Sequence, residues 1–320
     1  MKIVLYGGGG FIGHHLAAAL STRGHQLTIL TRDRESVKHL ILLPNTDVIA
    51  YNPTTIAGLL SPLADTDAVV NLVGILNERE RGDFERTHCE FVRVLVNGCH
   101  KNKVRRFVQM SALNAAPAAP SAYLRSKAKA EQIITESSMR WTVLRPSVVF
   151  GKGDHFINLF VRLARLAPIM FLPCADAQMQ PVAVEDVVRL IICVLEDDEG
   201  SGKKLSIGGP EVLSLADIVR RTLTAAQCSR PIIELGPSFS HMAAAVVEAI
   251  PGLHFLSRDN CLSAKLPSVC TSNNDGAKLL GNLLSLSSGL AAMFSDGNGP
   301  PYGGFGGLGR LSELREHSRR

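Results

Sequence analysis

The strongest constraint on this chain is a short apolar run that is followed at once by a cluster of glycines. Residues 3–6 have the continuous hydrophobic character of a buried parallel strand, and a helix-like stretch begins a few residues later. Between them, Gly7, Gly10 and Gly13 recur at every third position. A glycine triplet in this place predicts a loop whose backbone can approach a ligand closely.

The ligand that such a loop suits is the pyrophosphate of a dinucleotide. Side chains at Gly7 and Gly10 would keep the phosphates from the backbone N–H groups, and Gly13 lets the helix lie close to the sheet. A glycine-rich turn that binds nothing is the alternative interpretation. The candidate pyrophosphate-binding residues are Gly7, Gly10, Phe11, Ile12 and Gly13.

The rest of the chain alternates strand-like and helix-like segments. Strands are predicted at 26–30, 46–51, 67–74, 106–111, 141–149, 180–184 and 204–208, and helices at 14–23, 56–63, 85–103, 121–136, 154–166, 185–195 and 215–226. This order predicts an α/β fold, a Rossmann-type doubly wound parallel sheet with a smaller, mostly helical C-terminal substrate region. The expected division is 1–150 for the NAD(P)-binding domain, 151–295 for a substrate or partner region in which 180–208 return to the sheet, and 296–320 for a flexible tail.

Composition excludes several classes of function. The net charge is only +5 among 320 residues, and no dense basic block accompanies aromatic residues, so nucleic acid is not an expected partner. None of the seven cysteines forms a C-x-x-C pair, which predicts a reducing compartment and no metal site. The first strand begins near residue 3 and no apolar run reaches about 18 residues, so we expect a cytoplasmic protein, at most peripheral at the inner face of a bacterial membrane.

Cofactor preference should be decided just after the second strand. An acid there binds the ribose 2′-hydroxyl of NAD, and an arginine accommodates the 2′-phosphate of NADP. Arg32 follows this strand and Arg34 stands close behind, which predicts a preference for NADP(H). Two solvated loop arginines are the alternative, and Asp33 turned inward would still accept NAD(H).

Further cofactor contacts are expected at the carboxyl ends of later strands, where ligands of open α/β sheets bind. Asn71 interrupts an apolar strand at this end, and Gly74 would let the backbone pass close to a ribose. A buried asparagine satisfied by its neighbours is the alternative for Asn71. Pro146 and Val148 are predicted to lie near the nicotinamide.

Tyr123 and Lys127 are one helical turn apart and share a face of their predicted helix. An ammonium beside a phenol lowers the pKa of the phenol, which suits tyrosine to proton transfer, and the lysine can also reach a cofactor ribose. Tyr123 and Lys127 are therefore candidates for both catalysis and cofactor binding.

These motifs together resemble an atypical extended short-chain dehydrogenase/reductase. The matching segments include 67–76, 108–113, 123–131, 144–151 and 180–186. The resemblance is strongest to the nucleotide-binding accessory subunit of respiratory complex I and its bacterial relatives, which implies bound NAD(P)H and a link to ubiquinone or the respiratory chain. Active members usually place Ser or Thr just past the fifth strand, where this chain has Ala112; Ser111, one residue earlier, is the candidate carbonyl donor. Asn52 also departs from the family, since related reductases often carry an acid there.

Two functions remain open from the sequence. The first is an NAD(P)H-binding protein that acts through a quinone or respiratory-complex partner. The second is an oxidoreductase or nucleoside-diphosphate-sugar epimerase that uses Tyr123, Lys127 and Ser111. Ala112 favours the first.

One helix offers a face for peripheral membrane association. Its apolar residues are Phe156, Leu159, Phe160, Leu163 and Leu166, and Arg162 and Arg165 lie opposite. Packing of this helix against the protein core is the competing interpretation.

Overall fold

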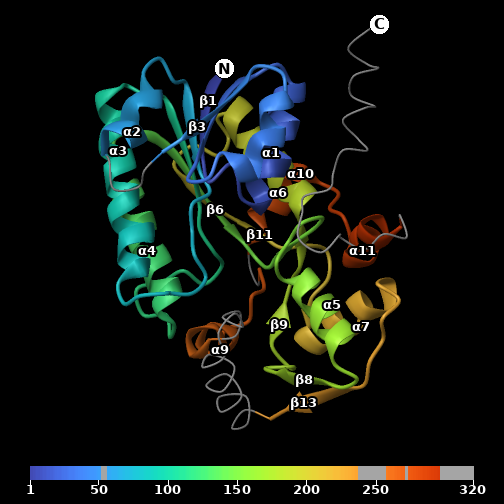
Figure 1. Cartoon of the computed structure of the whole chain (residues 1–320). Coiled ribbons are helices and arrows are strands. Elements are labelled where there is room, and N and C mark those ends of the chain that lie inside the picture. The colour runs from blue at the N-terminus through green and yellow to red at the C-terminus, as the bar shows by residue number, and fades with distance from the viewer. Residues whose placement is uncertain (52–55, 237–256, 271–272, 296–320) are drawn as a thin grey trace, which may run out of the picture.

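Seven parallel strands form the central sheet of the computed structural model, which describes residues 1–51, 56–236, 257–270 and 273–295 (Figure 1). Their order is β11-β6-β5-β4-β1-β2-β3. The strands are β1 (Lys2–Tyr6), β2 (Gln26–Thr31), β3 (Thr46–Ala50), β4 (Ala68–Asn71), β5 (Arg106–Met110), β6 (Arg140–Pro146) and β11 (Lys203–Ile207). The order reverses at β1, where β2 lies on one side and β4 on the other. This doubly wound sheet confirms the predicted fold class. In sheets of this kind ligands usually bind where the strand order reverses, which is the carboxyl end of β1 here.

Both faces of the sheet are covered, because successive side chains of β1 enter different cores. Ile3 and Leu5 pack with helices α1 (Phe11–Thr22) and α6 (Val184–Glu196), and α10 (Asp275–Leu280) joins this layer. Val4 and Tyr6 pack on the other face. That face is covered by α2 (Ile56–Leu60), α3 (Phe91–Lys101) and α4 (Ala122–Thr135), with the short helical segments η2 (Ser61–Leu63) and η3 (Glu85–Glu90) in the connections. The segment η1 (Glu35–Leu42) packs on the first face, with α1.

A smaller region lies beyond the carboxyl ends of the strands (Figure 1). Its helices are α5 (Ile157–Leu166), α7 (Leu215–Ala225), α9 (Arg258–Ala264) and α11 (Leu286–Phe294). Three pairs of short strands accompany them: β7 (Val149–Phe150) with β10 (Val182–Ala183), β9 (Gln178–Met179) with β12 (Leu213–Ser214), and β8 (Met170–Pro173) with β13 (Ile232–Leu235). Two apolar clusters of its own, one around Phe160 and one around Phe150, stabilise this region.

Three predicted strands are too long. The strand predicted at 67–74 ends at Asn71, because the Asn71 side chain accepts the N–H of Val73 at 3.1 Å and turns the chain. The strand predicted at 141–149 ends at Pro146, which has no N–H to donate. The strand predicted at 180–184 is reduced to β10, which pairs with β7 rather than with the central sheet. Asn52 and the predicted tail at 296–320 lie outside the described residues.

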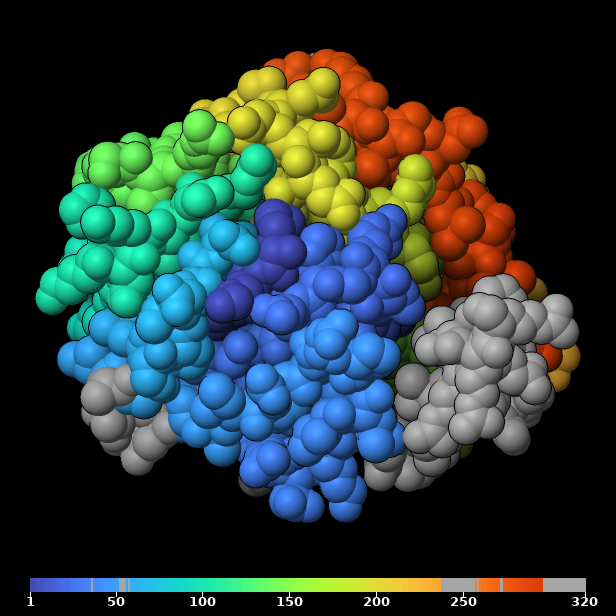
Figure 2. Space-filling view, turned by 90° about the horizontal axis from the view of Figure 1, so that it is seen from above, coloured from blue at the N-terminus to red at the C-terminus, as the bar shows by residue number. Residues whose placement is uncertain are grey.

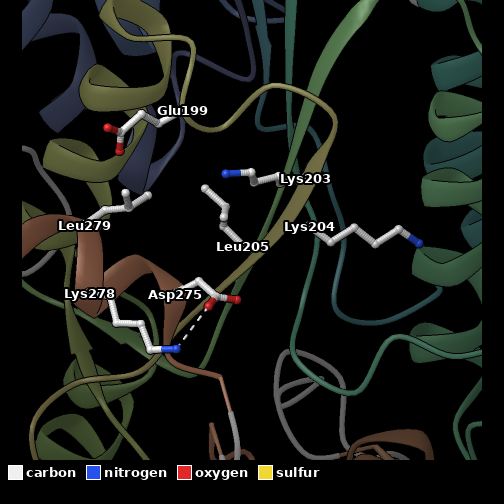
Figure 3. Close-up of a pocket in the computed structure, with 7 residues that line it drawn as sticks. All are labelled: Glu199, Lys203, Lys204, Leu205, Asp275, Lys278 and Leu279. Carbon is white, nitrogen blue, oxygen red and sulfur yellow. Dashed lines mark hydrogen bonds and ion pairs between the residues drawn. The ribbon is translucent and has the colours of Figure 1, made fainter.

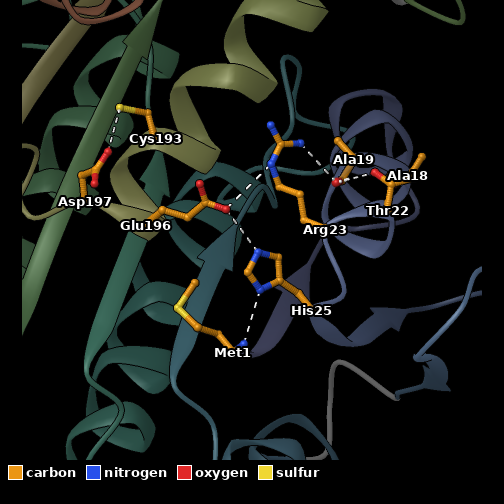
Figure 4. Close-up of polar contacts among 9 residues, drawn as sticks. All are labelled: Met1, Ala18, Ala19, Thr22, Arg23, His25, Cys193, Glu196 and Asp197. Atoms are coloured by element: carbon orange, nitrogen blue, oxygen red, sulfur yellow. Dashed lines mark hydrogen bonds and ion pairs between the residues drawn. The ribbon is translucent and has the colours of Figure 1, made fainter.

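The N-terminus closes the opposite end of the sheet. The Met1 amino group lies 3.3 Å from His25 Nδ1, and His25 Nε2 lies 3.4 Å from the Glu196 carboxylate, which also faces Arg23 at 3.7 Å (Figure 4). The blue N-terminal residues occupy the middle of this face in Figure 2. Because Arg23 and Glu196 are nearly half exposed, their ion pair stabilises the fold by about 1 kcal/mol or less.

The apolar face predicted to meet lipid is partly covered by the protein, and Phe156, Leu159 and Leu163 are half-buried. Phe160 is 8% exposed within the cluster that α5 and α7 share, and Phe156 and Leu163 pack against it. Leu166, at the end of α5, is 76% exposed. The structure therefore favours packing of this helix against the smaller region, and peripheral membrane association stays a prediction. Among the described residues, no helix is both long and apolar enough to cross a bilayer.

Introducing aspartate at a buried and at an exposed position of α5 tests this packing. We expect Phe160→Asp to lower the free energy of unfolding by about 3 kcal/mol or more, because it opens a cavity and buries a charge. Leu166→Asp, at the exposed position, should change it by about 0.5 kcal/mol or less. Urea denaturation measures both. Unchanged stability of Phe160→Asp together with a loss of binding to anionic vesicles would favour the membrane interpretation over the packing one.

Candidate functional site

The glycine loop leads from the end of β1 directly into α1, which begins at Phe11 with Gly10 as its N-cap. No side chain caps this helix and no acidic residue lies in its first turn. The N–H groups of that turn and the positive end of the helix dipole are thus left to favour an anion.

The three glycines of the loop do different things. A Cβ at Gly13 would lie 2.5 Å from Gly8 Cα, and one at Gly7, whose φ is +76°, would lie 2.9 Å from the backbone after β4. These two glycines are required by the fold itself. A Cβ at Gly10 meets only Gly7 O, at 3.2 Å. The backbone at Gly10 is therefore open enough for a ligand such as a pyrophosphate to approach, and a side chain there would fill the opening. Phe11 and Ile12 follow and pack half-buried against the core.

The loop after β2 presents Arg32 and Arg34 to solvent. Asp33 lies between them, and its carboxylate accepts the N–H of Glu35 at 3.0 Å, at the start of η1. Its backbone carbonyl accepts the Thr31 hydroxyl at 2.9 Å. The acid is thereby engaged in holding the turn, while both guanidinium groups lie at the surface.

A side-chain hydrogen bond joins the end of β4 to the neighbouring strand β5. Asn71 is fully buried and its amide donates to Gln109 at 2.8 Å. Both polar ends of Asn71 are used within the protein, so this side chain shapes the chain turn that leads to Gly74. A Cβ at Gly74 would lie 2.9 Å from Lys127 Nζ. Gly74 therefore lets the Lys127 ammonium approach the backbone.

Helix α4 carries Tyr123 and Lys127, and Lys127 lies beside Gly74. Its N-terminus is capped by Ser121 and by Asp259 of α9, whose carboxylate accepts the N–H groups of Ala122 and Tyr123 at 2.7 and 2.9 Å. Lys127 is 4% exposed and donates to Met110 O at 3.3 Å. Its Nζ lies 5.9 Å from the centre of the Tyr123 ring.

The electrostatics of this pair differ from the expectation. Burial lowers the pKa of Lys127 to about 8, against the opposing effect of Glu131. Burial also raises the pKa of Tyr123 to about 12, whereas the helical spacing predicts a lowered value. Desolvation of the phenolate outweighs the attraction of the ammonium, so the Tyr123 phenol stays protonated at neutral pH.

The Ser111 hydroxyl, which the sequence predicts as the carbonyl donor, is hydrogen-bonded within the protein. Its hydroxyl donates to the Glu131 carboxylate at 2.6 Å, and Ser111 is 5% exposed. Glu131 is itself 1% exposed and also binds Arg145, at 2.7 Å from Nε, and Lys204, at 3.0 Å. A buried carboxylate needs such partners, and the Ser111 hydroxyl is one of them.

Pro146 and Val148 lie where β6 leaves the sheet. Pro146 is buried and its carbonyl accepts the N–H of Leu113 at 3.1 Å, while half-buried Val148 binds Val182 through its carbonyl at 3.0 Å. Both residues thus belong to the carboxyl edge of the sheet that also carries the glycine loop and Lys127.

Sequence reasoning missed three residues of this site: His88, Glu131 and Asp259. His88 is 1% exposed beside Tyr123 and Gly74. Glu131 stands four residues after Lys127, a helical spacing that could have indicated their coupling. Asp259 lies 136 residues from Tyr123 in the sequence, so no local pattern indicates its contact.

A pocket of about 420 Å³ lies elsewhere, at the edge strand β11. Figure 3 shows Lys203 and Lys204 pointing to opposite sides of this strand, and Lys278 pairing with Asp275. Lys204 reaches across to Glu131. This pocket is formed by a charged sheet edge and contains none of the predicted cofactor residues.

Residues 7–155 match a family of proteins described as NAD(P)H-binding. The matched residues make up just under half of the chain, and this part of the chain is similar to that family. The match begins at the first glycine of the loop and ends just beyond β7. It confirms the predicted class of cofactor and leaves the choice between NADP(H) and NAD(H) undecided.

The resemblance to the complex I branch is also confirmed. The chain is 28% identical over 223 residues to the Arabidopsis thaliana protein named NADH dehydrogenase (ubiquinone) 1 alpha subcomplex subunit 9, mitochondrial, covering 67% of this chain and 55% of that one. The mouse protein of the same name is 28% identical over 222 residues, covering 68% and 59%. A ceramide reductase of Caulobacter vibrioides is 23% identical over 191 residues, 59% of each chain. The chain thus spans somewhat over half the length of these relatives.

Solved structures show the same fold. The Bacillus cereus UDP-glucuronic acid 4-epimerase in complex with UDP-glucuronic acid and NAD has a TM-score of 0.70 at 19% identity, over 91% of this chain and 97% of that one. A nucleoside-diphosphate-sugar epimerase of Staphylococcus aureus has a TM-score of 0.72 at 16% identity, over 91% and 99%. Identities this low support the architecture and say nothing of the reaction.

Valine at two glycines of the loop separates ligand binding from folding. Gly10→Val should fold, because a Cβ there meets only Gly7 O, and should bind no measurable NADPH, because the side chain fills the phosphate space. Gly13→Val should instead lose about 2–3 kcal/mol of stability, because its Cβ would overlap the backbone of Gly8. Thermal denaturation and fluorescence titration measure the two effects. Wild-type affinity in Gly10→Val would show that the phosphates bind elsewhere.

Proposed function

We propose that this protein binds NADP(H), in preference to NAD(H), and keeps it as a resident ligand rather than turning it over with common carbonyl substrates. The glycine loop would hold the pyrophosphate, Arg32 and Arg34 the 2′-phosphate, and Lys127 a ribose. The nicotinamide supplies hydride chemistry when bound, and the protein residues decide whether that chemistry is used.

The observation that carries this proposal is the position of the Ser111 hydroxyl. Hydride transfer builds charge on a carbonyl oxygen, and a donor must stabilise it. Ser111 donates to Glu131, and Ala112, the next residue, has no hydroxyl to offer. Tyr123, with its raised pKa, remains as a proton donor without the partner that an active site of this family uses.

A link to quinone or respiratory-chain metabolism is the second part of the proposal. It is supported by the relatives, which are named as subunits of a ubiquinone-reducing NADH dehydrogenase. The protein would act there through a protein partner, with the bound nucleotide stabilising the surface that the partner recognises.

An NAD(P)-dependent oxidoreductase or sugar-nucleotide epimerase is the competing function. The Tyr123–Lys127 pair favours it, as does the relative named as a ceramide reductase. The two functions make opposite predictions for Tyr123.

Arg32 tests the nucleotide preference. A charge-assisted contact to phosphate contributes about 1.5–3 kcal/mol, so the wild type should bind NADPH about tenfold or more tightly than NADH. Arg32→Ala should remove most of this difference and leave the affinity for NADH unchanged. Isothermal titration of both nucleotides measures it, and equal affinities in the wild type would contradict the assignment.

Tyr123 and Lys127 together test resident binding against turnover. Tyr123→Phe should leave the affinity for NADPH nearly unchanged, whereas Lys127→Ala should weaken it by about tenfold through loss of the ribose contact. NADPH oxidation with aldehydes, ketones and quinones should be slow or absent in all three proteins. Rapid oxidation by the wild type that falls a hundredfold or so in Tyr123→Phe, the scale of general acid catalysis, would establish the reductase.

A further inference from the structure

A buried histidine joins the two elements that meet at Lys127. His88 belongs to η3, a π-helical turn, and is 1% exposed. Its Nε2 accepts the N–H of Ile75 at 3.1 Å, in the loop after β4, and its Nδ1 lies 2.8 Å from the Ser126 hydroxyl of α4. One ring thus connects this loop to the helix that carries Tyr123 and Lys127.

The hydrogen bonds fix which nitrogen carries the proton. Ile75 N–H is a donor, so Nε2 must be unprotonated, and Nδ1 therefore carries the hydrogen of the neutral ring. The Ser126 hydroxyl donates to Tyr123 O at 2.7 Å and has a lone pair left for His88 Nδ1–H. Burial and the neighbouring Lys127 charge lower the pKa of His88 to about 2, so the ring stays neutral and in this tautomer.

The ring is held and placed by its neighbours. Phe84 stacks on His88 with ring centres 5.5 Å apart, and the Tyr123 ring lies edge-on at 5.9 Å. His88 Nε2 is 3.6 Å from the point where a Gly74 side chain would begin, and Lys127 Nζ is 2.9 Å from the same point. The imidazole, the ammonium and the Gly74 backbone therefore meet at one place.

We propose that His88 is a positioning residue for the ribose and nicotinamide end of the dinucleotide site: it fixes the Gly74–Ile75 backbone against Tyr123 and Lys127 through the Ile75–His88–Ser126–Tyr123 chain of hydrogen bonds. The role rests on the proposed function. The adenosine end of the ligand, near Arg32, is independent of this chain. Loss of His88 should therefore weaken only ligands that extend past the pyrophosphate.

Two nucleotides of different length test the proposal: NADPH, and 2′,5′-ADP, which has the adenosine and 2′-phosphate but no nicotinamide riboside. His88→Leu should weaken NADPH binding about tenfold, the loss expected from breaking a hydrogen-bonded network. It should leave 2′,5′-ADP binding unchanged. His88→Gln, which has one donor and one acceptor at similar reach, should restore most of the NADPH affinity. His100→Leu, an exposed position on α3, is the matched control and should equal the wild type.

Ser126→Ala is a second variant that tests the same hydrogen-bond chain if His88→Leu does not fold. It removes only the hydroxyl link and should also weaken NADPH selectively, with a shifted emission maximum of the bound reduced nicotinamide. Equal losses of both nucleotides in folded variants, or unchanged NADPH affinity, would overturn the positioning role while the proposed function stands. A wild type that binds neither nucleotide would overturn the proposed function, and the role of His88 with it.

Discussion

The close packing of backbone on backbone at the start of α1 is the constraint on which the site depends. No side chain fits at Gly13, whose Cβ would lie 2.5 Å from Gly8, so the helix sits directly on the end of β1. Gly7 turns the chain with a left-handed φ of +76° and touches the backbone that leaves β4. Further along the segment that leaves β4, Gly74 lets this backbone lie against the Lys127 ammonium. Glycines therefore set the separations of the phosphate loop, the β4 loop and α4, and the polar groups of the site follow.

A buried carboxylate then determines what the Ser111 hydroxyl contacts. Glu131 follows Lys127 by one helical turn on α4. It binds Ser111, which directly follows β5, and also Arg145 of β6 and Lys204 of β11. Breaking such a buried pair is costly, by about 3–5 kcal/mol, because it leaves a charge without its partner. The network therefore holds α4 rigidly across three strands, and it does so with the one hydroxyl that a reductase of this family would need near the carbonyl. Under the proposed function, the hydrogen bond from Ser111 to Glu131 both steadies α4 and removes this hydroxyl from carbonyl binding.

Local sequence pattern predicts those parts of the molecule that local forces decide. Strand and helix periodicity, the glycine triplet and the Tyr123–Lys127 spacing all lie within a few residues, and the doubly wound sheet follows from their order. The hydrogen bond from Ser111 to Glu131 could not be predicted this way. Glu131, Arg145 and Lys204 come together with Ser111 only when the strands pair and α4 packs on them. The pKa of Tyr123 is set by burial, which depends on the whole fold. Helix α5 shows the same limit: its apolar stripe indicates burial, and only the structure shows that Phe160 packs with residues of α7.

The most direct measurement is the identity of the nucleotide that the protein retains when it is purified without added cofactor. Released nucleotide would be identified by mass spectrometry, and its redox state by absorbance before and after prolonged incubation with carbonyls and quinones. A resident binding protein predicts nearly stoichiometric NADP(H) whose reduced form persists through the incubation. Protein that retains no dinucleotide, or reduced nucleotide that is oxidised as soon as one of these acceptors is added, would contradict the account.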